Sequence, residues 1–405
     1  MPDEVPTPEP KKPLIPKWID DFLPSNWRKI VAWLLLTLIV SGVNYILRKT
    51  GREPIPFPDV PDIFLVVPEG TLGDKDVDEL RRRGVDVKCA GWKKPTKEET
   101  DATLQILAEP RFADTPAGRA VMGDEDFPLW RLAIKGRGNR IPDRDQGQVG
   151  SCVSFGYAAA IEYTMATQKV IGKFPQDLPD ICQEAIYAGS RVEVNGGRVP
   201  FNGDGSTGAW GAKWLETTGG VLARGKYGNH DLTSYNVQRC KQWGTKGVPD
   251  ELEPEARKHK AKCSLVASAA EAKKALAQGY AISVCSDQGF SNVRDAEGFA
   301  RAQGSWAHCM CIIGYRADKA GFLILNSWGS GWITGPKGKF DDVPDGAFWA
   351  VESVVDRMLR QQDSYAVANA DGFKKRKIDP SDWIVSAPPK QRERKVSDAI
   401  FALAP

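Results

Sequence analysis

The chain has 405 residues, of which 41% are hydrophobic and 26% charged, and its formal net charge is +3. This length and composition fit one large globular domain with additional segments. So small a net charge gives no reason to expect a nucleic-acid partner. Eight cysteines are far too few for a small disulfide-rich scaffold, and they leave the redox compartment open.

The first residues alternate between polar, proline-rich stretches and one apolar run. Residues 1–29 contain seven prolines and five side chains of each charge, which predicts a disordered tail. Residues 48–61 are again rich in proline and predict a stiff spacer.

Between these stretches, residues 30–47 run for eighteen positions without a charge. As a helix they span roughly 27 Å, close to a hydrocarbon core of about 30 Å. A signal-peptide core and a buried helix are the alternatives, but the preceding segment is long, mixed in charge and proline-rich, unlike a signal-peptide n-region. We expect a single-pass membrane protein held in the lipid bilayer by this helix. Its orientation stays undecided, because positive charge is balanced on the two sides.

Residues 62–124 predict a small α/β unit without a catalytic constellation. Its expected elements are strands over 63–67 and 85–89 and helices over 76–83, 97–107 and 117–122.

A polar, glycine-rich loop over residues 145–151 then leads into an apolar helix that begins at Cys152 and runs to about Lys169. Unpaired backbone N–H groups and the helix dipole favour an anion at such a position, so the pKa of the Cys152 thiol is expected to fall. Gln146 has an amide that can donate a hydrogen bond beside the sulfur.

Two later residues complete a familiar order. His308 is one of only three histidines and follows Cys152 by 156 positions, and Asn326 comes eighteen positions later, within Asn-Ser-Trp-Gly. A cysteine, a distant histidine and then an asparagine is the order of a nucleophile, its base and the residue that orients the base. These residues resemble the papain-like cysteine peptidases, over about residues 125–368.

The resemblance implies an α+β fold with a helical lobe and a β-rich lobe and the active site in the cleft between them. Cys152 is then the nucleophile, and His308 holds it as a thiolate and later protonates the leaving amine. Asn326 fixes the imidazole, Trp328 shields that hydrogen bond from water, and Gln146 with the Cys152 backbone N–H forms the oxyanion hole.

The glycine-rich stretch 203–210 resembles the family's substrate-binding segment, in which glycines let an extended peptide approach the backbone closely. Its predicted substrate-binding residues are Gly205, Ser206 and Thr207, and Trp306 and Ala307 join them beside the histidine. The chain departs from the family pattern at several positions, which leaves the substrate preference open; these are Val149 in place of a cysteine, Val153 in place of an aromatic residue, and Ala307 in place of the aspartate of plant members.

The second half of this region predicts a β-rich lobe. Further helices are expected over 183–192, after Trp210 through Leu215 and, with a capping box at Ser268 and Glu271, over 268–278. The expected strands cover 280–284, 308–315, 321–326 and 347–351. Residues 369–405 form a polar, basic tail, expected to be a solvated tail rather than a site for anionic lipid or nucleic acid.

The sequence implies no cofactor and no metal. Cys309 and Cys311 share one face of a strand but lack two further ligands at a recognisable spacing, which favours core packing. The favoured function is a membrane-anchored cysteine endopeptidase acting on peptide or protein substrates. The alternatives are a non-catalytic, membrane-tethered binding or structural module with the same fold, and a transpeptidase that transfers the acyl group to an amine. An inhibitory role for residues 62–124 and the oligomeric state stay open.

Overall fold

The computed structural model describes residues 64–68, 82, 86–123, 125–138, 142, 144–172, 178–201, 203–369, 372–376, 378 and 383. By their packing, residues 1–89 and 90–405 form two separate units. In the first, strands β1 (Phe64–Pro68) and β2 (Asp86–Ala90) form a two-stranded sheet and confirm the two strands predicted there. The helices predicted over 30–47 and 76–83 lie outside the described residues, except for Arg82, and stay predictions. Within the described part of the chain, no helix combines the length and apolar character needed to cross a membrane.

The second unit contains a six-stranded antiparallel sheet with the order β5-β10-β6-β7-β8-β9. These strands are β5 (Lys262–Leu265), β6 (Ile282–Arg294), β7 (Ala300–Arg316), β8 (Gly321–Leu325), β9 (Ala347–Val351) and β10 (Tyr365–Ala368). The last strand pairs with both β5 and β6, so β10 lies in the interior of the sheet. A short two-stranded ribbon, β3 (Lys226–Tyr227) with β4 (His230–Asp231), lies in the helical part.

Helices make up the rest of the unit, and their bounds agree with most of the predicted ones. They are α4 (Lys97–Ile106), η1 (Phe112–Asp114), α5 (Leu129–Gly136), α6 (Cys152–Gly172), α7 (Gln183–Arg191), η2 (Glu193–Asn195), α8 (Gly208–Lys213), η3 (Trp214–Thr218), α9 (Val237–Lys246), α10 (Glu253–Arg257), α11 (Ala269–Ala277) and α12 (Glu352–Leu359). Ser268 caps α11 by accepting from the Glu271 N–H, as the capping box predicted.

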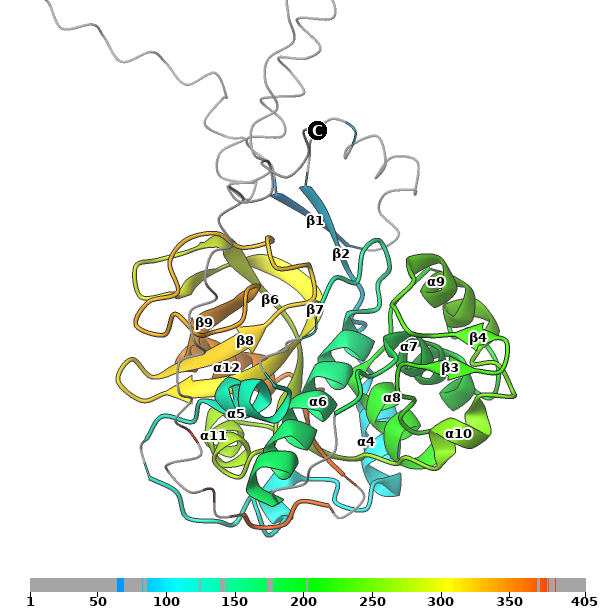
Figure 1. The fold of residues 1–405 in the computed structure, drawn as a ribbon, viewed down its shortest axis with the longest axis horizontal. Coiled ribbons are helices and arrows are strands. Elements are labelled where there is room, and N and C mark those ends of the chain that lie inside the picture. The colour runs from blue at the N-terminus through cyan, green and yellow to red at the C-terminus, as the bar shows by residue number, and fades with distance from the viewer. Residues whose placement is uncertain are drawn as a thin grey trace, which may run out of the picture. The chain divides into compact units, whose positions relative to one another are not determined.

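Helix α6 is the central element of this unit. It packs against β6, β7 and β10 on one side and against α7 and α8 on the other (Figure 1). Every residue from Cys152 to Thr164 is buried, which agrees with a helix predicted to be apolar on most faces. The helix therefore joins a helical layer to the sheet, and the family-like α+β architecture expected from the sequence is confirmed.

The helix predicted over 117–122 is wrong, because that stretch forms turns and extended backbone. Pro116 and Gly118 flank its start, and both residues are poor helix formers. This stretch lies within the larger unit: the Ala117 N–H donates to the Phe373 carbonyl at 3.1 Å, and the preceding Phe112 packs edge-on against Phe373.

One buried ion pair holds the start of α6 in place. The Arg144 guanidinium contacts the Glu162 carboxylate, and their side chains are only 3% and 1% exposed. Glu162 also accepts the Ile181 N–H at 2.8 Å. The pair therefore connects the loop before Cys152, the middle of α6 and the segment after it.

Replacing Glu162 with alanine should destabilise the protein by about 3–5 kcal/mol, because Arg144 then stays buried without its carboxylate. Urea unfolding followed by circular dichroism measures this change. Asp101→Ala is the matched control, since it removes an exposed partner of Lys97, and it should leave the unfolding midpoint unchanged. Equal midpoints for Glu162→Ala and the wild type would contradict the structural role of the pair.

Candidate active site

Cys152 is the first residue of α6, where the sequence placed it. The preceding loop is fixed to the segment after β8: the Gly329 N–H donates to the Arg144 carbonyl and the Gln146 N–H to the Ser327 carbonyl, both at 2.9 Å. Three backbone N–H groups lie near the thiol and favour its ionised form; they belong to Gly91, Val153 and Cys309. Cys309 directly follows His308 on β7. Two distant parts of the sequence thus meet at the sulfur.

His308 is fully buried and held on one side of its ring. Its Nε2 lies 2.7 Å from the Asn326 Oδ1, and the Trp328 indole stacks on the imidazole with ring centroids 4.3 Å apart. The His308 Nδ1 has no hydrogen-bond partner among the described residues, so it is the nitrogen left to exchange a proton. The Asn326 Oδ1 also accepts the Ser327 N–H at 2.7 Å, which fixes the amide orientation.

The expected fall in the pKa of Cys152 is wrong for this structure. Burial raises the pKa of the thiol, and this effect exceeds the opposing effect of the three backbone N–H groups. Burial also lowers the pKa of His308 to about 4, although the hydrogen bond that the ring donates to Asn326 acts in the other direction. Both groups are therefore neutral here rather than a thiolate and an imidazolium.

Gln146 is fully buried in the loop before the cysteine. Its Nε2 donates to the Val149 carbonyl at 2.8 Å, and its Oε1 accepts from the Ser327 Oγ at 2.7 Å. The amide plane is thus fixed by two neighbours, one from each of the segments that meet at the site.

Side chains of α7 fix the backbone of the glycine-rich segment 203–210. Arg191 donates to the Gly205 and Gly244 carbonyls, each at 2.7 Å, and also contacts the Gly203 carbonyl. The Gly205 N–H donates to the Tyr187 hydroxyl at 3.0 Å. Arg191 is only 1% exposed, so a buried cation fixes the backbone that the sequence predicted to bind an extended peptide.

That backbone edge is already paired with another part of the chain. Residues 91–93, here called the covering segment, run beside Ser206 as a parallel bridge: the Ser206 N–H donates to the Gly91 carbonyl at 2.9 Å, and the Lys93 N–H donates to the Ser206 carbonyl at 2.8 Å. On the other side, the Trp92 N–H donates to the Ala307 carbonyl at 2.9 Å. The covering segment therefore bridges the glycine-rich edge and the strand that carries His308.

The covering segment fits closely over the cysteine. Gly91 lies so near the loop that an added Cβ would be 2.0 Å from the Gly150 carbonyl oxygen, and its backbone N–H reaches the Cys152 thiol. Cys152 and Trp92 are 0% and 2% exposed. Only glycine fits at position 91 without displacing backbone.

The Trp92 side chain ends on a buried carboxylate. Its indole Nε1 donates to the Asp363 Oδ2 at 2.7 Å, and the carboxylate also accepts the Gly208 and Ala209 N–H groups, each at 2.7 Å, at the start of α8. Burial raises the pKa of Asp363 to about 7, although all three donors oppose this shift. A single carboxylate thus connects the covering segment to the glycine-rich segment.

The three remaining predicted residues have different surroundings. Thr207 is buried and caps α8, where its Oγ1 accepts the Trp210 N–H at 3.0 Å. Ala307 is exposed and offers its carbonyl to the covering segment. Trp306 is only 8% exposed and packs against Trp328, with ring centroids 4.9 Å apart, and against Trp332 at 6.1 Å. Its contacts therefore support the indole that stacks on His308.

Three contributors to this site have no motif in the sequence. Trp92 follows a predicted strand, Arg191 ends a predicted helix, and Asp363 precedes the last strand. Their roles arise from contacts over long sequence separations, such as the 271 positions between Trp92 and Asp363. A Gly-Trp pair directly after a strand is the one local signal that could have drawn attention to the covering segment.

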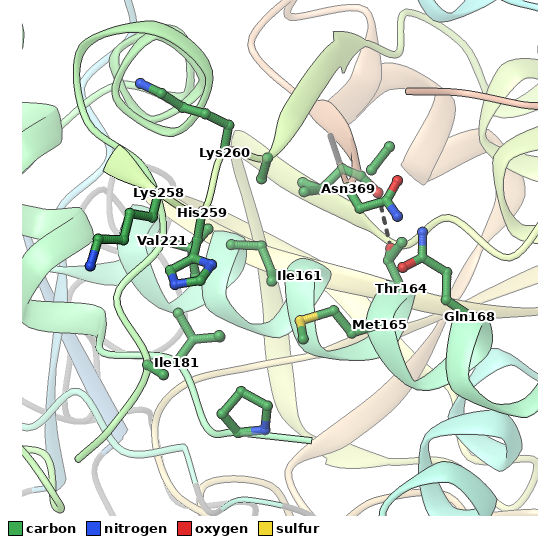
Figure 2. Close-up of a pocket in the computed structure, with 15 residues that line it drawn as sticks. Ile161, Thr164, Met165, Gln168, Ile181, Val221, Lys258, His259, Lys260 and Asn369 are labelled. Atoms are coloured by element: carbon green, nitrogen blue, oxygen red, sulfur yellow. Dashed lines mark hydrogen bonds between the residues drawn. The ribbon is translucent and has the colours of Figure 1, made fainter. Parts of the chain in front are cut away.

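A pocket of about 400 Å³ lies elsewhere on the same unit. Figure 2 shows that side chains of α6, including Ile161 and Met165, form one of its walls and His259 lies opposite them. None of the candidate site residues lines it. Cys309 and Cys311 are both buried in the sheet, 0% and 1% exposed.

Comparisons with known proteins point to one family. A family model described as "Papain family cysteine protease" matches residues 133–340, just over half of the chain. Xylellain, a cysteine protease from Xylella fastidiosa, is 18% identical, with a TM-score of 0.41, over 69% of this chain and 95% of its own. Procathepsin B S9 from Trypanosoma congolense is 11% identical, with a TM-score of 0.40, over 74% of this chain and 98% of its own. No curated protein matches the sequence.

The lowered pKa of the buried His308 imidazole should be measurable in solution. With the pKa of His308 lowered from 6.5 to about 4, the stability that its neutral form contributes is present above pH 6.5 and is lost as the pH falls toward 4. Histidine NMR signals of the full chain in detergent, recorded between pH 8 and 4, measure the midpoint, and His308→Ala identifies the signal. A His308 midpoint above about 6 would show that the ring is not desolvated.

Proposed function

Since the chain belongs to the papain family of cysteine proteases, we propose that it is an endopeptidase that hydrolyses peptide bonds through a covalent acyl-enzyme at Cys152. The observation that carries this proposal is the joint placement of Cys152 at the start of α6 and of the held imidazole of His308 on the adjacent strand. A thiol beside a helix N-terminus and a base fixed by a third residue are the parts that nucleophilic catalysis needs.

In this mechanism the Cys152 thiol gives its proton to the His308 Nδ1 and attacks the peptide carbonyl. The tetrahedral oxyanion accepts a hydrogen bond from the Cys152 backbone N–H, and the Gln146 side-chain amide is the proposed second donor. His308 then protonates the leaving amine, and water hydrolyses the thioester by the reverse proton route. Asn326 keeps the ring in its tautomer, and Trp328 keeps water from that hydrogen bond.

The covering segment supports a peptide as the substrate. It is an extended peptide whose backbone pairs with Ser206 on one side and Ala307 on the other, and it places Gly91 over the sulfur. A peptide substrate can use the same backbone groups once the segment leaves. We therefore propose that residues 91–93 keep the enzyme inactive in the form described here, and that their departure returns water to Cys152 and His308.

Departure would also change the proton balance of the pair. Burial is the largest cause of both pKa shifts, so removing it lowers the pKa of the thiol and raises that of the imidazole. The two changes bring the ion pair of thiolate and imidazolium within reach. Covering the site thus blocks both access and activation.

Gly91→Ala should open the site, because its new Cβ would lie 2.0 Å from the Gly150 carbonyl oxygen. Trp92→Ala should do the same, because it removes the hydrogen bond to Asp363 and the buried indole. Together these two contacts favour the closed form of the site over the open form by a factor of at least about 10. The rate at which iodoacetamide alkylates Cys152, followed by mass spectrometry, should rise accordingly. The exposed neighbour Lys94→Ala is the control and should match the wild type. Equal rates in all four proteins would refute the covering role.

Hydrolysis of denatured casein by the full-length chain, as wild type and as Trp92→Ala, tests the catalytic assignments. Cys152→Ala and His308→Ala should each reduce the rate by at least about 10⁴-fold, since the two act as one unit. Asn326→Ala should cost about 10–10²-fold, because it acts through the imidazole. His259→Ala, an exposed histidine, should have no effect. Turnover that survives Cys152→Ala would defeat the proposal, and a larger loss in Asn326→Ala than in His308→Ala would reverse the assigned roles.

A further inference from the structure

Two cysteines outside the proposed catalytic set lie side by side beneath the active site. Cys285 on β6 and Cys309 on β7 are direct partners in the antiparallel register. Their sulfur atoms are 2.6 Å apart, and both side chains are fully buried. Residues directly opposite in antiparallel strands have Cα atoms about 4.5–5.5 Å apart, which lies within the range that a disulfide requires.

The surroundings hold this pair in place. The Cys309 sulfur lies 3.2 Å from the Ser283 hydroxyl, and the Cys285 N–H donates to the Ser364 hydroxyl at 3.2 Å. On the other side, Gly156 of α6 is so close that an added Cβ would be 2.9 Å from the Cys309 sulfur. Neither thiol reaches solvent, and no other pair of described cysteines shares a register position in the sheet.

We propose that Cys285 and Cys309 form a disulfide that joins β6 to β7 directly after His308, when the chain folds in the presence of a small-molecule disulfide oxidant. The inference is independent of the proposed peptidase activity, because it rests on the strand register and on the packing around the two sulfurs.

The chemistry balances with glutathione disulfide as the oxidant. One cysteine thiolate attacks it and releases one glutathione thiol, and the second cysteine displaces the other glutathione from the mixed disulfide. The two cysteines lose two electrons and two protons, and glutathione disulfide gains them as two thiols. Because both sulfurs are buried after folding, the exchange takes place while the strands are still open, and the folded sheet then encloses the bond.

The bond would act on the site through the backbone. Cys309 follows His308, and its backbone N–H lies near the Cys152 thiol, so fixing Cys309 to β6 also fixes the part of β7 that carries the proposed base. The closed loop spans 24 positions, which is long enough for a clear gain in stability.

The test refolds the full-length chain in detergent with a mixture of reduced and oxidised glutathione. The protein is then unfolded in a denaturant that contains N-ethylmaleimide, which alkylates every free thiol, and it is digested and analysed by mass spectrometry. We expect a cross-linked peptide pair containing Cys285 and Cys309, two hydrogen atoms lighter than the two thiol peptides, with the other six cysteines alkylated. Cys311→Ser, the matched control from the same face of β7, should keep the cross-link, and Cys309→Ser should abolish it and leave Cys285 alkylated.

A second measurement compares two redox states of one protein, so it does not depend on whether Cys309→Ser and Cys311→Ser fold. The oxidised wild type should melt about 5–10 °C higher than the same protein reduced by dithiothreitol, and Cys152→Ala should show the same difference. Complete alkylation of all eight cysteines after oxidative refolding would overturn the proposal. A cross-link between Cys152 and Cys309 would also overturn it, because the oxidation site would then be the nucleophile.

Discussion

The close approach of α6 to the sheet at Gly156 is the constraint on which the site depends. An added Cβ there would lie 2.9 Å from both the Cys309 sulfur and the Ser283 hydroxyl, and 3.0 Å from the Met310 carbonyl. Only a residue without a side chain lets the helix lie this near the strand. Cys152 begins the same helix one turn earlier, so this contact brings the proposed nucleophile to the backbone of β7 and thus to the neighbourhood of His308. The Arg144–Glu162 pair keeps the helix and its entering loop in this position.

Burial links the steric and electrostatic properties of the site. The same covering segment that fills the space over Cys152 also removes water, and removing water disfavours the charged forms of both Cys152 and His308, the proposed catalytic pair. Asp363 is subject to the same effect, yet it is held by three N–H donors, one of which belongs to the covering segment. The state of the site is therefore set by solvent access, more than by any single hydrogen bond.

The sequence predicted those parts of the site that are encoded locally. Cys152 at a helix start and a glycine-rich backbone edge at Ser206 follow from apolar patterning and glycine placement. In the structure Cys152 begins α6, and the backbone of Ser206 pairs with the covering segment. The sequence could not reveal what covers these groups, because burial depends on contacts between distant segments. For this reason it predicted the wrong direction for the pKa of Cys152, and it missed Trp92 and Asp363.

The covering segment is part of the polypeptide that it blocks, and this has a consequence for how strongly it must bind. A tethered peptide experiences an effective concentration in the millimolar range, whatever the amount of protein present. In the proposed inhibited form, three backbone hydrogen bonds and one indole are therefore enough to compete with substrates that are dilute by comparison. The connection from the covering segment to the rest of the second unit is short, because α4 begins only four residues after Lys93. A single chain break in that interval would separate the segment from this unit, and dilution alone would then favour its release.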